Sequence, residues 1–231
     1  MSKLGTINAL KQSAMLNFSK YGLEAASLRD IARDAGVPLS AVHIYFGSKS
    51  DLYAEVSRIA WEDLERERDD LIDAATKRNK HGIASLRDII HALAYPVARR
   101  GLSDKETDLA WVWMLRGGVW QHGYPSSPHM IGGSEKAIAR WINEVEIRCS
   151  ELSHVDVVWA YSFVLGTIYS WQLIDRLYDR FIEGEEHGTV DRITNDIVLF
   201  CCSGIDAMIA DRRCAALPSL NHSGRVSSGA L

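Results

Sequence analysis

The chain has 231 residues, of which 47% are hydrophobic and 24% are charged. This is the balance of a folded globular protein, and it excludes a mainly disordered chain. The formal net charge of −4 excludes a uniformly basic nucleic-acid coat. It is compatible with a small DNA-reading domain carried on an acidic body.

The sequence favours a cytoplasmic protein that does not enter a membrane. No uninterrupted apolar stretch reaches the roughly 18 residues of a membrane span, and the N-terminus lacks an apolar core followed by a small-residue cleavage site. No cysteines are spaced as C-x-x-C, which suits a reducing compartment. We expect all four to be buried as small apolar side chains: Cys149, Cys201, Cys202 and Cys214.

Apolar residues recur every three or four positions, whereas alternating strand patterns and hairpin dipeptides are absent. We therefore predict an all-α protein of about nine helices. The first helix ends at Gly22, because glycine favours a helix C-terminus. A short second helix covers about 28–35, with Ser27 and Asp30 arranged as an N-terminal capping box and Gly36 ending the helix.

A third short helix is predicted over about 39–45, broken by Gly47. Ser48, with Asp51 three residues later, caps a fourth helix. The highly charged stretch 62–70 of that helix is expected to be a solvated face. Further helices are predicted at about 83–100, 104–118, 133–151, 154–182 and 190–213.

Two short helices joined by a tight turn at Gly36 and Val37 indicate a helix-turn-helix, whose second helix fits the major groove of B-DNA, about 12 Å wide. Val42 and Phe46, four apart, should face the core that these two helices form with the first helix. The remaining side chains should project outward and suit contact with phosphates and base edges: Leu39, Ser40, His43 and Ile44. Residues 1–52 hold six lysines and arginines against four acidic residues, a surplus of the sign that DNA requires.

An ordered pattern extends over residues 7–52, through Phe18, Gly22, Ser27, Asp30, Ile31, Ala32, Ala35, Gly36, Val37, Ala41, Tyr45, Phe46, Ser48, Lys49 and Leu52. In this pattern the chain resembles the N-terminal DNA-binding domain of the TetR family of transcriptional regulators. The resemblance implies a DNA-binding domain over 1–52, a helical ligand-binding and dimerisation domain over 53–216, and a flexible tail over 217–231. It also implies an operator in double-stranded DNA, a small-molecule effector and a homodimer.

The resemblance implies roles for individual residues of the head. Ser27 and Arg29 lie where members of the family contact the DNA backbone or a base edge, and Lys49 lies where a lysine clamps a phosphate. The groove-facing set would be Leu39, Ser40, His43, Ile44 and Tyr45. Pro38, Leu39 and His43 depart from residues common in the family. Leu39 offers no hydrogen bond and would touch a thymine methyl instead.

The remaining helices supply independent support for an assembly and a pocket. The helices predicted at 154–182 and 190–213 are apolar on more than one face, and two copies could pack as a four-helix interface. An aromatic cluster predicts a pocket for an apolar or aromatic molecule; each residue taken singly could equally fill the core. The candidates are Trp111, Met114, Trp120, His122, Trp171 and Gln172.

Catalytic and metal-binding patterns are missing from the sequence, so we predict no enzyme, no cofactor and no metal site. The leading interpretation is a DNA-binding regulator, a repressor released from its operator by a small molecule. The alternative is a non-catalytic helical regulator that acts through protein partners with a weakened DNA-binding head. Pro38, Leu39 and the modest local charge favour that alternative.

Overall fold

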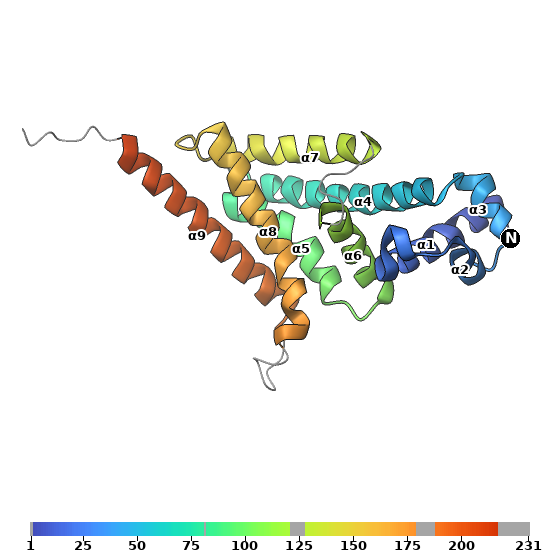
Figure 1. Ribbon diagram of the computed structural model, residues 1–231. Helices are drawn as coiled ribbons and strands as arrows, with labels where there is room; N and C mark the ends of the chain where they lie inside the picture. Colours follow the sequence, from blue (N-terminus) through green and yellow to red (C-terminus); the bar gives the residue numbers. More distant parts are fainter. Residues whose placement is uncertain (1, 81, 121–127, 179–187, 217–231) are drawn as a thin grey trace, which may run out of the picture.

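The structure is a computed structural model. It describes the backbone of residues 2–80, 82–120, 128–178 and 188–216, and the side chains of residues 2–80, 82–115, 135–170 and 188–215. Within these ranges the protein is all-α, as predicted (Figure 1). The helices are α1 (Lys3–Ala25), α2 (Leu28–Asp34), α3 (Leu39–Phe46), α4 (Lys49–Arg78), α5 (Leu86–Gly101), α6 (Glu106–Trp120), α7 (Pro128–Glu146), α8 (His154–Tyr178) and α9 (Val190–Ala216).

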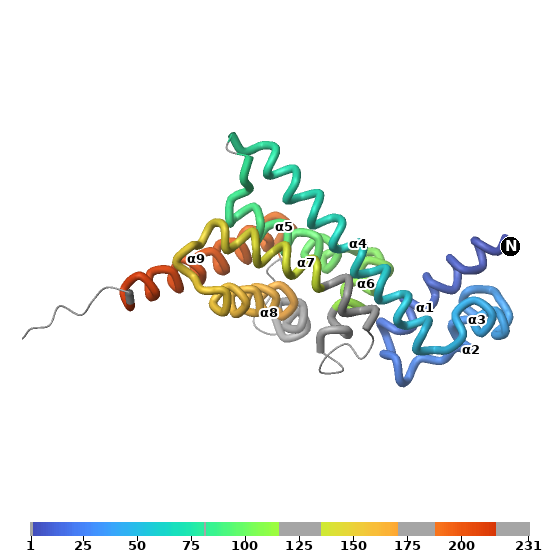
Figure 2. Tube along the Cα trace, turned by 90° about the horizontal axis from the view of Figure 1, so that it is seen from above, coloured from blue at the N-terminus to red at the C-terminus, as the bar shows by residue number. Residues whose placement is uncertain are grey.

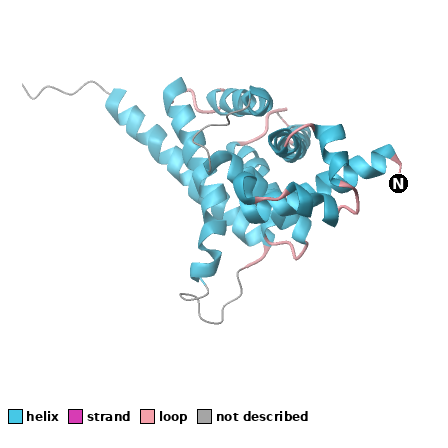
Figure 3. Ribbon diagram, turned by 45° about the vertical axis from the view of Figure 1, so that its right-hand side comes forward, coloured by secondary structure: helices cyan, strands magenta, loops and turns pink. Residues whose placement is uncertain are grey.

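The helices form two groups linked by α4. Helices α1 to α3, here called the head, lie together at one end of the molecule (Figure 1). Helices α5 to α9, here called the body, form the other end, with α9 farthest from the head. The long helix α4 runs from the head along α7, a path that is also visible from above (Figure 2). Seen obliquely, the described part of the chain is helices joined by loops (Figure 3).

Serine caps start several helices, because a side-chain oxygen satisfies a backbone N–H that has no partner within the helix. Ser48 and Asp51 form the predicted capping box at the start of α4. Ser27 caps α2 by accepting from the Asp30 N–H, but the Asp30 carboxylate pairs with Arg33 instead of completing a capping box. That part of the prediction is wrong, because Arg33 offers the carboxylate a stronger, charged donor one helical turn away.

The sequence predicts that α1 ends at Gly22. In the structure Gly22 kinks the helix instead. It has a φ of 71°, a left-handed conformation that suits glycine, and the chain continues in helical form to Ala25. The extra turn carries the chain toward α2, and the Ala26 N–H bonds back to the Gly22 carbonyl.

Two hydrophobic clusters hold the fold together, and α4 belongs to both. In the head, Leu10, Phe18 and Val42 are buried with Leu52 of α4, and Phe18 meets Tyr53 edge to face with ring centroids 5.1 Å apart. Beyond Val56, α4 turns its apolar side chains into the body cluster. The domain boundary expected at residue 52 therefore falls inside a continuous helix.

The charged stretch 62–70 does not form the solvated face that its composition predicts. Leu64 and Arg68 are buried and Glu65 is half-buried, because this part of α4 is covered by α5 and α7. The other face of the stretch does reach solvent, at Glu62, Arg66 and Asp70 on successive turns. A run of charges marks a solvated face only where no other helix packs over it.

Three of the four cysteines are buried as expected: Cys149, Cys201 and Cys202. Cys214 is exposed instead, because it lies in the last turns of α9, where the described residues 211–215 extend past the helices that cover the rest. Burial raises the pKa of the Cys202 thiol to about 11, which keeps it protonated at neutral pH.

Helix α9 is apolar on more than one face, as predicted, and it is also long. Its segment Val190–Ala215 contains an 18-residue window with a mean hydropathy of 1.5, long and apolar enough by composition to cross a membrane. One third of that window is buried, and α9 packs along α5 in the described structure. Core helices of globular proteins also reach this hydropathy, so composition alone does not make α9 a span.

Replacing Leu52 with alanine tests whether the start of α4 stabilises the head. Leu52 is fully buried in the head cluster, so Leu52→Ala should lower the free energy of unfolding by about 2–5 kcal/mol. Urea denaturation of the whole chain, followed by circular dichroism, measures this change. The control Leu4→Ala removes an equally large side chain that is 68% exposed and should change stability by less than about 0.5 kcal/mol. Equal effects of the two substitutions would contradict the assignment.

Candidate functional site

The turn between α2 and α3 has the geometry of a helix-turn-helix. At the end of α2, the Gly36 N–H donates to the Arg33 carbonyl and the Val37 N–H donates to the Ala32 carbonyl, both at 3.0 Å. This is a Schellman motif, in which the residue after the cap adopts a left-handed conformation. Gly36, with a φ of 67°, fills that position. Pro38 then precedes the first turn of α3, where its missing N–H costs nothing.

Helix α3 has a buried face and a free face. Ala41 and Val42 are buried in the head cluster. On the other side, Ser40, His43 and Ile44 are exposed, and Ile44 leaves 74% of its surface open. Of the other residues in the groove-facing set, Leu39 and Tyr45 are half-buried against the head cluster, so they present only part of their surface.

His43 is held by a backbone hydrogen bond. Its Nδ1 lies 2.9 Å from the carbonyl oxygen of Gly47, so Nδ1 carries the proton and donates to that oxygen. The Gly47 N–H in turn donates to the His43 carbonyl at 3.1 Å. The imidazole therefore has a defined orientation at the end of α3, with Nε2 left over for another partner.

Lys49 joins the start of α4 to the connection between α1 and α2. Its Nζ donates to the carbonyls of Glu24 at 2.8 Å and Ala26 at 3.3 Å. Two of its three N–H donors are used in this way, which leaves one for another acceptor. Ser27, in the same connection, is committed as the N-cap of α2, and Arg29 in the first turn of α2 is exposed to solvent.

Much of the head's positive charge is neutralised within the protein. Lys11 pairs with Glu55 at 2.7 Å, and Arg33 pairs with both Asp30 and Asp34. Within the described part of the chain, Lys3 and Arg29 make no ion pair. The charge available to an external anion therefore comes from these two side chains and from Lys49, which is bound only by neutral carbonyls.

Comparisons with known proteins agree with this geometry. Residues 12–56 match the family described as "Bacterial regulatory proteins, tetR family". The head therefore matches the DNA-binding part of the TetR family in sequence. A stretch of 59 residues is also 39% identical to the HTH-type transcriptional regulator BetI of Agrobacterium fabrum. That stretch covers 26% of this chain and only 29% of BetI.

Solved structures of TetR-family regulators share the fold over most of the chain. The regulator PfmR from Thermus thermophilus superposes with a TM-score of 0.54, 21% identity, and coverage of 84% of this chain and 96% of PfmR. A TetR-family regulator from Marinobacter aquaeolei gives a TM-score of 0.57 at 16% identity, with coverage of 85% of this chain and 95% of that regulator. At these identities the likeness establishes the fold, including the helical body, and nothing finer.

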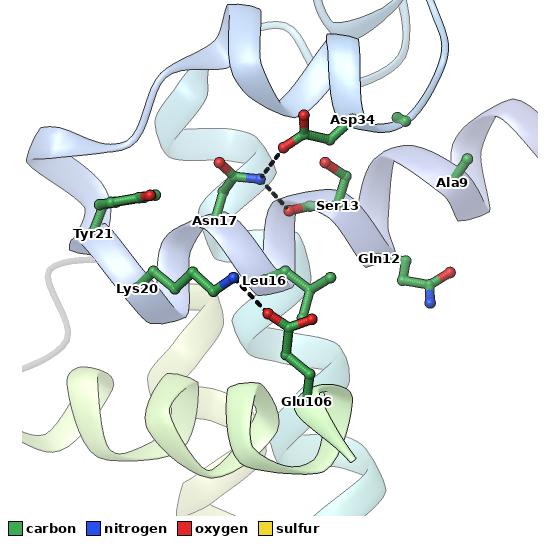
Figure 4. A pocket seen from close by; sticks show the side chains of 10 residues that line it. Ala9, Gln12, Ser13, Leu16, Asn17, Lys20, Tyr21, Asp34 and Glu106 are labelled. Carbon is green, nitrogen blue, oxygen red and sulfur yellow. Dashed lines mark hydrogen bonds and ion pairs between the residues drawn. The ribbon is translucent and has the colours of Figure 1, made fainter. Parts of the chain in front are cut away.

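A cleft of about 500 Å³ marks the junction between head and body (Figure 4). Lys20 of α1 pairs with Glu106 of α6 at 2.5 Å, and this contact raises the pKa of Lys20 above its ordinary value. Asn17, which is buried, donates to the Ser13 carbonyl and to the Asp34 carboxylate. Sequence reasoning missed the Lys20–Glu106 pair, because no local pattern connects two residues so far apart in the chain.

The predicted ligand-binding residues are separated by the fold. Trp111 is buried in the body cluster, and the Arg100 guanidinium lies over its ring, 4.0 Å from the centroid. Met114, one turn later, is buried in the head cluster and links α6 to the head. Trp113 faces the opposite way and is 47% exposed. The remaining candidates have side chains outside the described residues: Trp120, His122, Trp171 and Gln172.

An apolar groove of about 940 Å³ lies between α8 and α9. Phe163 and Phe200, 61% and 70% exposed, line it together with Gly166, Gly204 and Met208. Outside the groove on α8, Trp159 is also exposed and stacks on Phe163. The sequence predicts that α8 is apolar on more than one face. The face that carries Trp159 and Phe163 is uncovered, whereas Tyr169 is buried.

Substitution of Gly36 tests the turn of the helix-turn-helix. A Cβ at this position meets nothing within 4 Å, so the cost of Gly36→Ala comes from the backbone conformation alone and should be about 1–2 kcal/mol. Gly36→Asn should cost less, since asparagine tolerates left-handed φ values better than alanine. Urea denaturation gives both values. If alanine were tolerated as well as asparagine, the left-handed turn would not be a constraint on this sequence.

Proposed function

We propose that this TetR-family protein is a dimeric DNA-binding regulator, a repressor that leaves its operator when the body binds a small molecule. The observation that carries the proposal is the free face of α3. Ser40, His43 and Ile44 are exposed on a helix whose opposite face is buried in a compact head. These exposed side chains do not contribute to packing within the head.

The dimensions and chemistry of α3 suit the major groove. Its eight residues make a rod about 12 Å long, which fits a groove about 12 Å wide. The Ser40 hydroxyl and the imidazole Nε2 of His43 supply hydrogen bonds to base edges or phosphates. Ile44 and the open part of Leu39 supply apolar surface for a thymine methyl.

Around α3, we assign phosphate contacts to Arg29 and to the remaining donor of Lys49, with Ser27 and Tyr45 at the edge of the contact surface. Arg29 is exposed in the first turn of α2, where backbone N–H groups also attract anions. Lys49 is already oriented by the Glu24 and Ala26 carbonyls, so little side-chain freedom is lost when it meets a phosphate.

The second copy is assigned to the groove between α8 and α9. Exposed Phe163 and Phe200 form an apolar patch of the kind that marks a protein interface. Gly166 and Gly204 leave open space on both helices, which permits close helix approach. A two-fold arrangement of α8 and α9 makes a four-helix interface and joins two heads in one particle.

Effector response follows from the continuity of α4. Two recognition helices must sit about 34–36 Å apart to reach successive turns of DNA. Because α4 is packed in both clusters, a body conformation that moves α4 also changes the separation of the heads. A small molecule that favours that conformation lowers the affinity for DNA by population shift.

DNA binding can be tested with a duplex selected from a random-sequence library by the wild-type chain. We expect an inverted repeat whose half-sites lie one helical turn apart. Ser40→Glu adds a carboxylate to the free face of α3 and should weaken binding by at least about 10-fold, because it repels phosphates. Ser150→Glu, also exposed but in the body, should have no effect. Failure to enrich any duplex at low salt would favour the alternative regulator that acts through protein partners.

The assembly can be tested by Phe200→Asp, which places a charge in the groove between α8 and α9. Sedimentation equilibrium should give twice the chain mass of 25.8 kDa for the wild type and the single-chain mass for the variant. Ile147→Asp is the matched control, since Ile147 is 59% exposed on the α7 side and does not line the groove. A variant that remains dimeric would place the interface elsewhere.

A further inference from the structure

Arg68 is a buried cation without a counterion in the described part of the chain. Only 6% of it is exposed, although it lies in the charged stretch of α4. Its Nη2 donates to the Leu93 carbonyl of α5 at 2.9 Å, while its buried Nε has no hydrogen-bond partner. Within the described residues no carboxylate lies within 4 Å of the guanidinium. A guanidinium with one neutral partner is far from satisfied, because it carries five donors and a full charge.

The contact with Leu93 explains the position of Arg68 but not its charge. A neutral amide donor would satisfy the Leu93 carbonyl equally well. The retained positive charge therefore points to an anion that is not part of the described chain.

Aromatic side chains with unused polar atoms surround this cation. Trp141 of α7 and Tyr161 of α8 pack with ring centroids 4.8 Å apart. Burial raises the pKa of Tyr161 to about 12, with smaller electrostatic effects from Arg68, Tyr169 and Glu65. The indole Nε1 of Trp141 and the hydroxyl of Tyr169 are buried without partners. Buried donors without partners thus lie on α4, α7 and α8.

Glu65, one turn before Arg68, forms no ion pair with it. Its Oε1 is buried without a hydrogen-bond partner. Burial raises the pKa of Glu65 to about 7, against the opposing effect of Arg68. Near neutral pH this carboxyl is therefore protonated in a large fraction of molecules, and a protonated carboxyl donates a hydrogen bond instead of repelling an anion.

We propose that the body binds a small organic carboxylic acid between α4, α7 and α8, with the carboxylate on Arg68 and the apolar part against Trp141, Tyr161 and Tyr169. The inference rests on the proposed function, since it names the chemical class of the effector. A carboxylate fits because one guanidinium balances its single charge and can bind both oxygens. The site differs from the cluster around Trp111 that the sequence favours.

The first experiment uses the whole wild-type chain and pairs of probes that differ only in charge. Octanoate, benzoate and phenylacetate are each compared with the corresponding primary amide by calorimetric titration. At least one acid should bind at least about 10-fold more tightly than its amide, because only the acid pairs with the guanidinium. Binding of no acid, or equal binding of acid and amide, would overturn the proposal.

The second experiment removes the charge. Arg68→Gln keeps a donor for the Leu93 carbonyl but should abolish the preference for acid over amide, whereas Arg68→Lys should retain part of it. The control Arg66→Gln changes a neighbouring exposed arginine and should keep the wild-type preference. If Arg68→Gln does not fold, Tyr169→Phe gives a second reading: loss of one donor should weaken acid binding without abolishing it. A preference unaffected by both changes refutes the site.

The failure of this site and the failure of the proposed function have different signatures. Binding to the selected duplex is measured on the same preparations without any acid. A chain that binds DNA but no acid retains the proposed regulation and loses this site. A chain that binds an acid through Arg68 but no duplex retains the site and loses the DNA-binding function.

Discussion

One helix that is packed into two cores governs this structure. Helix α4 contains 30 residues and is about 45 Å long. Its first turns are buried with the head and the remainder with the body. Neither group can rearrange around α4 without disturbing packing in the other, because close-packed interiors adopt discrete arrangements instead of deforming smoothly. The Lys20–Glu106 pair and Met114 add a second connection beside it, through α6.

Local signals were sufficient to predict the head from the sequence. Ser48 and Asp51 mark the start of α4 through hydrogen bonds within one turn. Gly36 marks the turn through its own backbone conformation. Such features depend on residues that are close in sequence, so they can be recognised from the sequence alone. The same reasoning failed at Asp30, because the competing partner Arg33 was equally local.

The body was predicted only as helices, because its chemistry depends on which faces meet. Periodicity found an apolar stripe on α8, yet Tyr169 is buried and Phe163 is exposed. A charged run suggested solvent, yet Arg68 lies inside the protein. Each outcome depends on helices that are distant in sequence, and a single sequence carries no record of those contacts. The part of the pocket prediction that involves Trp120, His122, Trp171 and Gln172 lies outside the described side chains.

The uncovered phenylalanines on α8 and α9 also have a consequence for the cell. If the groove closes only when two copies meet, the concentration of the dimer follows the law of mass action and grows with the square of the chain concentration while the protein is scarce. Newly made chains then expose the apolar groove between α8 and α9 to chaperones and proteases until they dimerise. Gene dosage and translation rate would thereby set the concentration at which the dimer forms.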